Sequence, residues 1–493
     1  MTTRTLLLPW SIYKEFRALW LAWCVCVLVL IVPTLLQAPR YVRGLQVIAY
    51  ILGAAALGAL SIGHEYMDRT LHLLLCLPVR RRRLLLLKLG ALAPLLAALG
   101  VVAYTDLFHE MPADRQFERL AASLLPLLGG LFIAPWLTMA CRSPLAGIAL
   151  TVAIPFPLVM VGRAIAVRIG AREDEFMMAF LWWGASGLCA IGAIATRRMF
   201  MRLEAIDGCV EDLPLPQLPH LRRARASNGA GAAVAALTRR HPIWQLVTKE
   251  LRVQQPLLFM TGLYLFGWLA VTVRASNAPL DLNAALSAFY ALLLAVLAGS
   301  LGSAEERQLG TIDWQVLQPI AMWRQWAVKM AVVLGLPMLL GIGLPMLLAH
   351  VAPAAGGRPV VGQPLAMNLL LLTAGSLYVS SLCGSGAWAL VTSLAVTFGV
   401  IFFQNVVLGV DAAWLFSGPA PSAATLHGSQ VVHGLDLLLI AGLIGVLARF
   451  ALSNHRTAER SAWRVCRQVA VLTVFATLRV VILSDAAALS QRW

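Results

Sequence analysis

Two similar stretches organise this chain. They read GHEYMDRTLHLLLCLPVRRRRLLLLK at residues 63–88 and AEERQLGTIDWQVLQPIAMWRQWAVK at residues 304–329. Five residue types recur at the same internal spacing, and the members of each pair are 241 residues apart: Glu65 and Glu306, Thr70 and Thr311, Pro78 and Pro319, Arg83 and Arg324, and Lys88 and Lys329. A second match, YKEFR at residues 13–17 and TKELR at residues 248–252, is separated by 235 residues. The repeat predicts two copies of one structural unit.

The composition predicts that these units lie in a membrane. Of 493 residues, 60% are hydrophobic and 13% are charged, whereas a soluble domain has roughly 25% charged residues. A helical span needs about 20 apolar residues, and lipid excludes an open sheet edge. We therefore expect an all-α integral membrane protein with about twelve transmembrane helices, arranged as two six-helix repeats. The apolar runs that predict these spans are 18–36, 45–62, 84–104, 120–139, 144–161, 176–195, 256–273, 282–301, 330–349, 365–382, 386–408 and 431–448.

A further apolar run, residues 469–483, follows the twelfth predicted span. It is either a thirteenth span or an extra C-terminal helix at the membrane interface. The run is short and contains Arg479, and a charged residue inside the bilayer is costly. These two features favour the interfacial position.

The positive charges predict the orientation. The net charge is +16, and arginines gather after the second, sixth and twelfth predicted spans. Loops rich in lysine and arginine favour the cytoplasmic side. We therefore expect both halves to start and end in the cytoplasm, in a multi-pass protein of the bacterial inner membrane. Anionic lipid headgroups account for the basic surface better than nucleic acid does.

The pattern divides the chain into four parts. These are the first six-span repeat (1–203), a cytoplasmic linker (204–241), the second six-span repeat (242–453) and a cytoplasmic or interfacial tail (454–493). The linker is polar and rich in proline and glycine, which is typical of a flexible connection. The eight cysteines form no CxxC pair, and His64-Glu65 lacks a second histidine, so no metal site is expected.

Each repeated stretch predicts a short amphipathic helix between the second and third spans of its half. Thr70 or Thr311 is placed to cap it, Leu71 or Ile312 follows, and Pro78 or Pro319 ends it. The glutamate before the helix could accept backbone hydrogen bonds or pair with a nearby arginine and so hold the helix at a fixed angle. A rigid charged helix of this kind suits docking to a cytoplasmic partner.

These features resemble the permease subunits of type-2 ABC exporters. In that family a coupling helix between the second and third spans carries a glutamate, Gly-Thr-hydrophobic, hydrophobic-Pro, arginine and lysine. The second half matches this pattern with Glu306, Gly310, Thr311, Ile312, Pro319 and Arg324. The first half matches with Glu65, Thr70, Leu71, Pro78 and Arg83, but has Arg69 where glycine is usual. The resemblance implies that both elements contact ATPase subunits, and it covers nearly the whole chain outside the linker and tail.

The chain itself has no phosphate-binding loop of the type Gly-x4-Gly-Lys-Ser/Thr, so it is not expected to be an enzyme. The resemblance therefore implies two copies of a separate cytoplasmic ABC ATPase, which would hold ATP and magnesium. Membrane lipids and an unknown exported substrate complete the expected partners, and no cofactor is expected in this chain. Three polar residues within spans, Asn368, Gln404 and Asn405, are candidates for the substrate pathway, although such residues more often join helices.

Two other classes of protein are alternatives to an exporter permease. A secondary transporter of the major facilitator type also has two six-span halves and a central loop. The spans contain no carboxylate clearly at their midplane, which counts against proton-driven transport. An intramembrane serine protease is suggested only by Gly184-Ala185-Ser186-Gly187, and small residues in a span are more often helix-packing residues.

Overall fold

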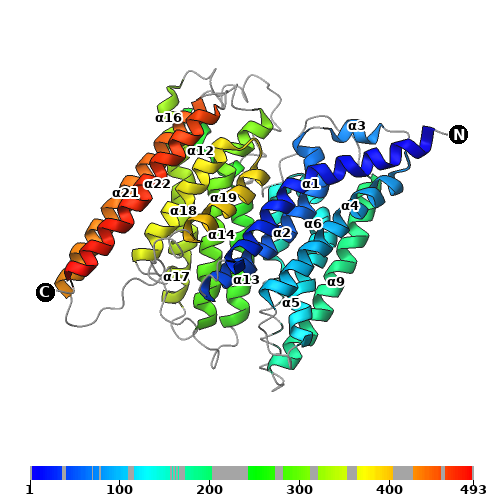
Figure 1. The fold of residues 1–493 in the computed structure, drawn as a ribbon, viewed down its shortest axis with the longest axis horizontal. Coiled ribbons are helices and arrows are strands. Elements are labelled where there is room, and N and C mark those ends of the chain that lie inside the picture. Colours follow the sequence, from blue (N-terminus) through cyan, green and yellow to red (C-terminus); the bar gives the residue numbers. More distant parts are fainter. Residues whose placement is uncertain are drawn as a thin grey trace, which may run out of the picture.

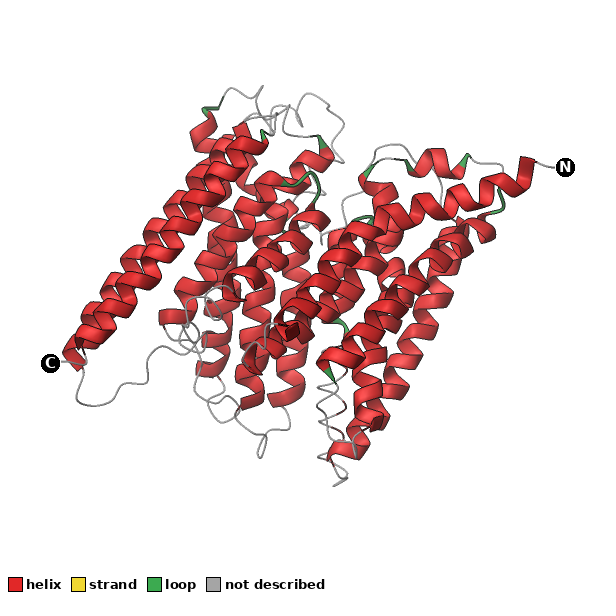
Figure 2. Ribbon diagram, in the orientation of Figure 1, coloured by secondary structure: helices red, strands yellow, loops and turns green. Residues whose placement is uncertain are grey.

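The fold is built from helices alone within the part of the chain that the computed structural model describes (Figure 2). That part comprises residues 3–35, 40–68, 70–76, 79–108, 116–155, 158, 162, 165, 173–202, 242–272, 281–310, 320–351, 363–402, 426–456 and 461–490. Helices are the expected solution for a chain of this hydropathy, since each satisfies its own backbone groups.

The first half occupies one side of the molecule and the second half the other (Figure 1). The first half contains α1 (Thr3–Leu35), α2 (Arg40–Met67), α3 (Leu71–Leu75), α4 (Arg81–Val102), η1 (Ala103–Leu107), α5 (Gln116–Leu128), η3 (Gly129–Ile133), α6 (Ala134–Cys141), α7 (Pro144–Ala153) and α9 (Glu173–Arg202). The second contains α12 (Pro242–Val253), α13 (Gln255–Thr272), α14 (Asp281–Leu309), α16 (Met322–Met338), η4 (Leu339–Gly343), α17 (Leu344–Val351), α18 (Gln363–Leu382), α19 (Gly386–Phe402), α21 (Leu426–Arg456) and α22 (Ala462–Ser490). The η segments are π-helical turns.

Eight of the described helical segments are long and apolar enough to cross a membrane, which makes this a multi-pass membrane architecture. They are Tyr13–Leu35, Gln46–Met67, Arg81–Leu107, Arg119–Cys141, Leu286–Gln308, Met322–Val351, Leu365–Leu382 and Gly434–Arg456. Two shorter apolar helices, Pro144–Ala153 and Gly386–Thr397, follow the fourth and seventh of these segments. The eight segments coincide with eight of the twelve runs expected from the sequence.

The first helix of each half differs between the two halves. In the first half α1 runs without a break from Thr3 to Leu35. In the second half a turn at Gln254 separates α12 from α13, and Pro256 follows at the second position of α13. Proline has no backbone N–H and fits the first turn of a helix, so it explains why the helix restarts here.

Helices pack very closely within each half at a matched pair of glycines. A Cβ atom added at Gly58 of α2 would lie 1.8 Å from the backbone oxygen of Gly130, and one added at Gly299 of α14 would lie 2.6 Å from that of Thr373. Gly58 and Gly299 are 241 residues apart, so the close approach of the second span to its neighbour occurs at the same place in both halves.

The two halves meet along matched helices. α1 of the first half contacts α19 of the second, and α13 of the second half contacts α7 of the first; α2 and α7 also contact α19. One continuous apolar core includes Leu19 and Leu57 from the first half with Leu257 and Leu390 from the second. Apolar packing therefore joins the halves directly.

The last helix, α22, packs against α21 as its antiparallel partner (Figure 1). Arg479 of α22 pairs with Asp436 of α21 at 2.7 Å, and Gln468 exchanges hydrogen bonds of 3.0 Å with Asn454 at the other end of the pair. The sequence favoured an interfacial position for this segment. In the structure it lies along α21, which contains a candidate span, and whether the segment lies at the interface stays a prediction.

Candidate functional site

A buried group of charged side chains joins the cytoplasmic ends predicted for α1, α2 and α4. The Lys88 ammonium of α4 donates hydrogen bonds to both carboxylate oxygens of Glu15 at 2.9 and 3.0 Å, and to one of Glu65 at 3.2 Å. It also donates to the backbone oxygen of Ser61 at 3.3 Å. Lys88 is 2% exposed and Glu65 is fully buried. We call the buried Glu15, Glu65 and Lys88, together with the exposed Lys14, the first charge cluster.

Further contacts of Glu65 extend the first charge cluster toward the predicted coupling helix. Lys14 of α1 pairs with Glu65 at 3.2 Å. The Thr70 hydroxyl, which stands directly before α3, donates to the other oxygen of the same carboxylate. The Thr70 backbone N–H also bonds to the Glu65 carbonyl at 3.0 Å. The Glu65 carboxylate, near the end of α2, therefore contacts Lys14 of α1, Lys88 of α4 and Thr70, the residue directly before α3.

The second half contains a cluster of the same composition. The Lys329 ammonium of α16 lies 2.6 Å from Glu306 of α14 and 3.2 Å from Glu250 of α12. Lys249 of α12 donates a short hydrogen bond to the other oxygen of Glu306. Lys329 is 2% exposed and Glu306 is fully buried. We call Lys249, Glu250, Glu306 and Lys329 the second charge cluster.

The correspondence between the clusters extends to the backbone. Lys329 donates to the Gly302 oxygen at 2.7 Å, and Gly302 stands 241 residues after Ser61, the acceptor for Lys88. The residues before α4 and α16 also share one conformation, with φ and ψ of −59° and 129° at Arg80 and −54° and 131° at Ala321. The third helix of each half therefore begins in the same way and brings its lysine to the same place.

The named lysines and glutamates of the two clusters balance in charge. Each has two lysines and two glutamates, so the formal charges cancel. Removing ions from water costs several kcal/mol per ion, and close pairing with added hydrogen bonds offsets that cost. Glu250 lies on α12, before the apolar helix α13. Burial raises the pKa of the Glu250 carboxyl; Lys329 opposes this rise and Glu306 adds to it.

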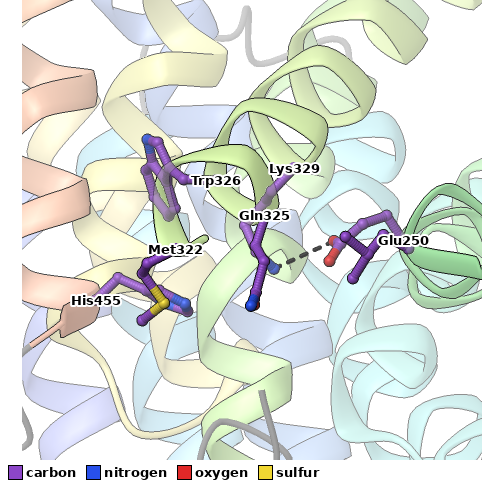
Figure 3. A pocket seen from close by; sticks show the side chains of 7 residues that line it. Glu250, Met322, Gln325, Trp326, Lys329 and His455 are labelled. Carbon is purple, nitrogen blue, oxygen red and sulfur yellow. Dashed lines mark hydrogen bonds and ion pairs between the residues drawn. The ribbon is translucent and has the colours of Figure 1, made fainter. Parts of the chain in front are cut away.

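A small cleft adjoins the second charge cluster (Figure 3). Its walls include Glu250, Lys329, Trp326 and His455, and the Lys329–Glu250 ion pair crosses one side of it. Its volume is about 10 Å³, which is room for about one water molecule. The His455 Nδ1 atom lies 3.1 Å from the Ser303 hydroxyl, so the cluster region also contacts α21. No cargo fits here.

The first charge cluster also brings together three groups that can ligate metals. Ligand atoms of Glu15, His64 and Glu65 lie within 4.8 Å of one another. The sequence alone gave no reason to place Glu15 beside His64-Glu65. The Lys88 ammonium already contacts both carboxylates, so the balancing cation belongs to the chain itself. The absence of a metal remains a prediction.

The structure places the residues predicted for coupling as follows. Glu65 and Glu306 lie at the centres of the two clusters, and two lysines pair with each of them. Thr70 precedes α3 and its side chain binds Glu65, while Leu71 is the first residue of α3. Arg83 and Arg324 are exposed and each is the third residue of its helix. Gly310 follows α14 with φ 68°, a left-handed conformation that suits glycine after a helix. Pro78, Thr311, Ile312 and Pro319 lie outside the described residues.

The residues proposed for a substrate pathway are not brought together in the described part. Asn368 lies in α18 and is half-buried, whereas Gln404 and Asn405 lie outside the described residues. An apolar cavity of about 80 Å³ instead lies between the halves. It is lined by α1, α2, α7 and α19, with Val29, Leu52, Ile148 and Leu394 among its walls.

The sequence did not identify the four lysines, or the glutamates of the first helix of each half, as site residues. Lys14, Glu15, Lys249 and Glu250 belonged to the second sequence match, and Lys88 and Lys329 to the first. Both matches are visible in the sequence, but the matched residues are 235 residues apart in one and 241 residues apart in the other. Aligning the halves with a gap of six residues would have placed two lysines and two glutamates at equivalent positions in each half, which is the signal for paired clusters.

Comparison of the chain with family models, with curated proteins and with solved structures gives no match.

Proposed function

We propose that this chain is the membrane permease of an ATP-driven exporter, resembling type-2 ABC exporters, and that each half engages one cytoplasmic ATPase subunit. The observation that carries this proposal is the occurrence of two buried charge clusters of the same composition, each beside a predicted coupling element. A secondary transporter does not need two such charge clusters beside short cytoplasmic elements.

The first charge cluster has the geometry of a mechanical joint. Glu65 binds side chains of α1 and α4, and its hydrogen-bond partner Thr70 stands directly before α3. A push on α3 would therefore reach three helices at once rather than bend a loop. Because packed helices move as rigid bodies, the cluster would convert a displacement of the partner into a tilt of its half. Glu306, Lys249 and Lys329 supply the equivalent joint in the second half.

The proposal includes the finer architecture. The eight candidate spans, the shorter α7 and α19, and the helices α9 and α13 together account for twelve spans in two six-helix halves. Both halves would begin and end in the cytoplasm of a bacterial inner membrane. The apolar cavity between α1, α2, α7 and α19 lies where two tilting halves would open and close a path, which supports alternating access at this interface. ATP and magnesium would bind to the partner chains.

The test replaces Glu65 and Glu306 with glutamine, singly and together, in the reconstituted complex with its ATPase. Glutamine keeps the shape and loses the charge, so the joint should loosen while the membrane fold persists. Losing a charged hydrogen-bonded contact costs roughly 1–3 kcal/mol. We therefore expect ATP-driven change in the distance between labels on α2 and α14 to fall several-fold, with ATP hydrolysis uncoupled from it or partner binding weakened.

Asp106→Asn provides the control, because it removes a carboxylate at the opposite end of the Arg81–Leu107 segment from Lys88. It should leave both measurements unchanged. Unchanged values in Glu65→Gln, Glu306→Gln and the double variant would show that the clusters only stabilise the fold, and the coupling role would be abandoned.

A further inference from the structure

Six exposed arginines gather where α4 begins and α9 ends. They are Arg80, Arg82, Arg83, Arg197, Arg198 and Arg202, which we call the arginine patch. Within the described part of the chain, none of these six side chains forms a hydrogen bond or an ion pair, whereas the lysines of the two charge clusters are all paired. The patch is therefore a concentration of cationic groups that the described part of the chain does not neutralise.

A seventh arginine holds the two helix ends together. Arg81 donates a hydrogen bond of 2.7 Å from its guanidinium to the backbone oxygen of Met201. This contact satisfies a carbonyl in the last turn of α9 and fixes the start of α4 beside it. The arginines before and after Arg81 are consequently held next to those of the last turns of α9. The N-terminus of α4 adds its own partial positive charge.

The same two helices present apolar side chains below the patch. Leu86 of α4 is 69% exposed, and Ile191 and Ile194 of α9 are 55% and 54% exposed. Leu86 lies one turn beyond Arg82, and Ile194 lies one turn before Arg198, so on each helix exposed arginine gives way to exposed aliphatic surface. A molecule that satisfies both surfaces has an anionic head and a hydrocarbon body.

The second half lacks this feature at the equivalent helix. Where the first half has four consecutive arginines at residues 80–83, the second has Ala321, Met322, Trp323 and Arg324. Membrane orientation alone does not require this difference, because both helices would need the same orientation signal. The additional arginines of the first half therefore indicate a ligand that the second half does not bind at this position.

We propose that the arginine patch binds the phosphate headgroup of an anionic phospholipid, whose acyl chains lie along the exposed aliphatic faces of α4 and α9. Guanidinium groups bind phosphate through paired hydrogen bonds, and basic groups at the membrane surface attract anionic lipids. An acidic surface of a protein partner is the other occupant to consider. The exposed aliphatic residues directly below the patch favour lipid, since they lie where a cytoplasmic protein does not reach.

The test uses two variants that each remove four arginines. In the patch variant Arg80, Arg82, Arg197 and Arg198 become glutamine, while Arg81 remains to hold α4 to α9. In the control variant Arg449, Arg456, Arg464 and Arg467, at the ends of α21 and α22 that meet through Asn454 and Gln468, become glutamine. Both variants lower the net charge equally, so a nonspecific electrostatic effect is the same in each.

The full-length proteins are purified and titrated with nanodiscs or micelles that contain phosphatidylglycerol, cardiolipin or phosphatidylcholine, and bound lipid is counted by native mass spectrometry. The wild type and the control variant should retain anionic lipid, and phosphatidylcholine should not compete. The patch variant should bind anionic lipid roughly tenfold or more weakly, because each basic residue at an anionic surface contributes about a fivefold factor. Thermal unfolding without added lipid shows that both variants remain folded.

Equal loss of lipid in the two variants would mean that only net charge matters and would overturn the proposal. Full retention in the patch variant would do the same, as would loss of a co-purified protein partner with lipid binding unchanged. A patch variant that fails to fold is replaced by the pairs Arg80→Gln with Arg82→Gln and Arg197→Gln with Arg198→Gln. Each pair should then weaken binding several-fold, and no weakening in either pair would contradict the site.

Discussion

At the scale of single residues, the account depends on two buried lysines. Lys88 and Lys329 each place an ammonium between a glutamate of the first helix and a glutamate of the second helix of their half. A buried charge of this kind is tolerated only while its partners remain, and removing one partner leaves an uncompensated ion. The lysines therefore fix three helices relative to one another.

Replacing Lys329 with methionine should destabilise the protein by roughly 3–5 kcal/mol, because Glu250 and Glu306 would face each other with only Lys249 to balance them. Adding Glu250→Gln to this variant restores neutrality and keeps the Lys249–Glu306 pair. The double variant should therefore be more stable than the single one. Thermal unfolding in detergent measures both, with Arg324→Met as an exposed control. A double variant that loses the sum of the two single effects would show that the cluster is not an interacting unit.

The sequence identified part of this residue-level picture. Glu65 and Glu306 were identified because the matched residues of their two stretches are all separated by 241 residues. Both glutamates are buried at the centres of the clusters. The sequence left backbone amides and a nearby arginine open as their partners, and did not point to the lysines that pair with them. Arg83 and Arg324 instead start their helices on the exposed side, while Lys88 and Lys329 lie five residues further, where helical geometry turns them inward.

At the scale of helices, the glycine pair Gly58 and Gly299 governs how closely the second span of each half can pack. Nothing larger than hydrogen fits at Gly58, because the Gly130 carbonyl oxygen occupies the space. The apolar runs predicted α2 and α14 well, but a sequence without an alignment gives no distance between helices. The seventh predicted span begins at Pro256, two residues after the turn at Gln254 that separates α12 from α13.

Gly58→Ala should destabilise the protein by about 1–3 kcal/mol, since an added methyl group must push α2 away from η3. Gly187→Ala on α9 is the matched control, because a Cβ at that position meets nothing within 4 Å. The control should be neutral or stabilising by up to about 1 kcal/mol, as is usual when alanine replaces glycine within a helix. Midpoints of thermal unfolding compare the two. Equal midpoints would mean that this close approach is not maintained in the protein in solution.

At the scale of the whole molecule, helices of the two halves pack directly against each other. The contacts of α1 with α19 and of α13 with α7 lie within one apolar core. Composition predicted a helical membrane protein, and the eight candidate spans agree with that. The pairing of α22 with α21 could not be inferred in the same way, because Asp436, the partner of Arg479, lies 43 residues away in the sequence.

Cutting the chain within the linker 204–241, at an inserted protease site, should leave the two halves associated. The apolar core that they share supplies the contacts, and the linker itself lies outside the described residues. Size-exclusion chromatography in detergent, followed by detection of both fragments, gives the answer. Separation of the fragments after complete cleavage would mean that the interface between the halves is too weak to stand without the connection.

Native mass spectrometry of the purified complex shows whether one chain carries two sites for ATPase subunits. We expect one copy of this chain with two ATPase subunits, because each half has its own charge cluster beside a predicted short element. The Glu65→Gln and Glu306→Gln double variant, purified in parallel, should retain the subunits less well or hold them without coupling. A complex of two copies of this chain with two ATPase subunits, or a chain that binds none, would mean that one chain does not carry two coupling sites.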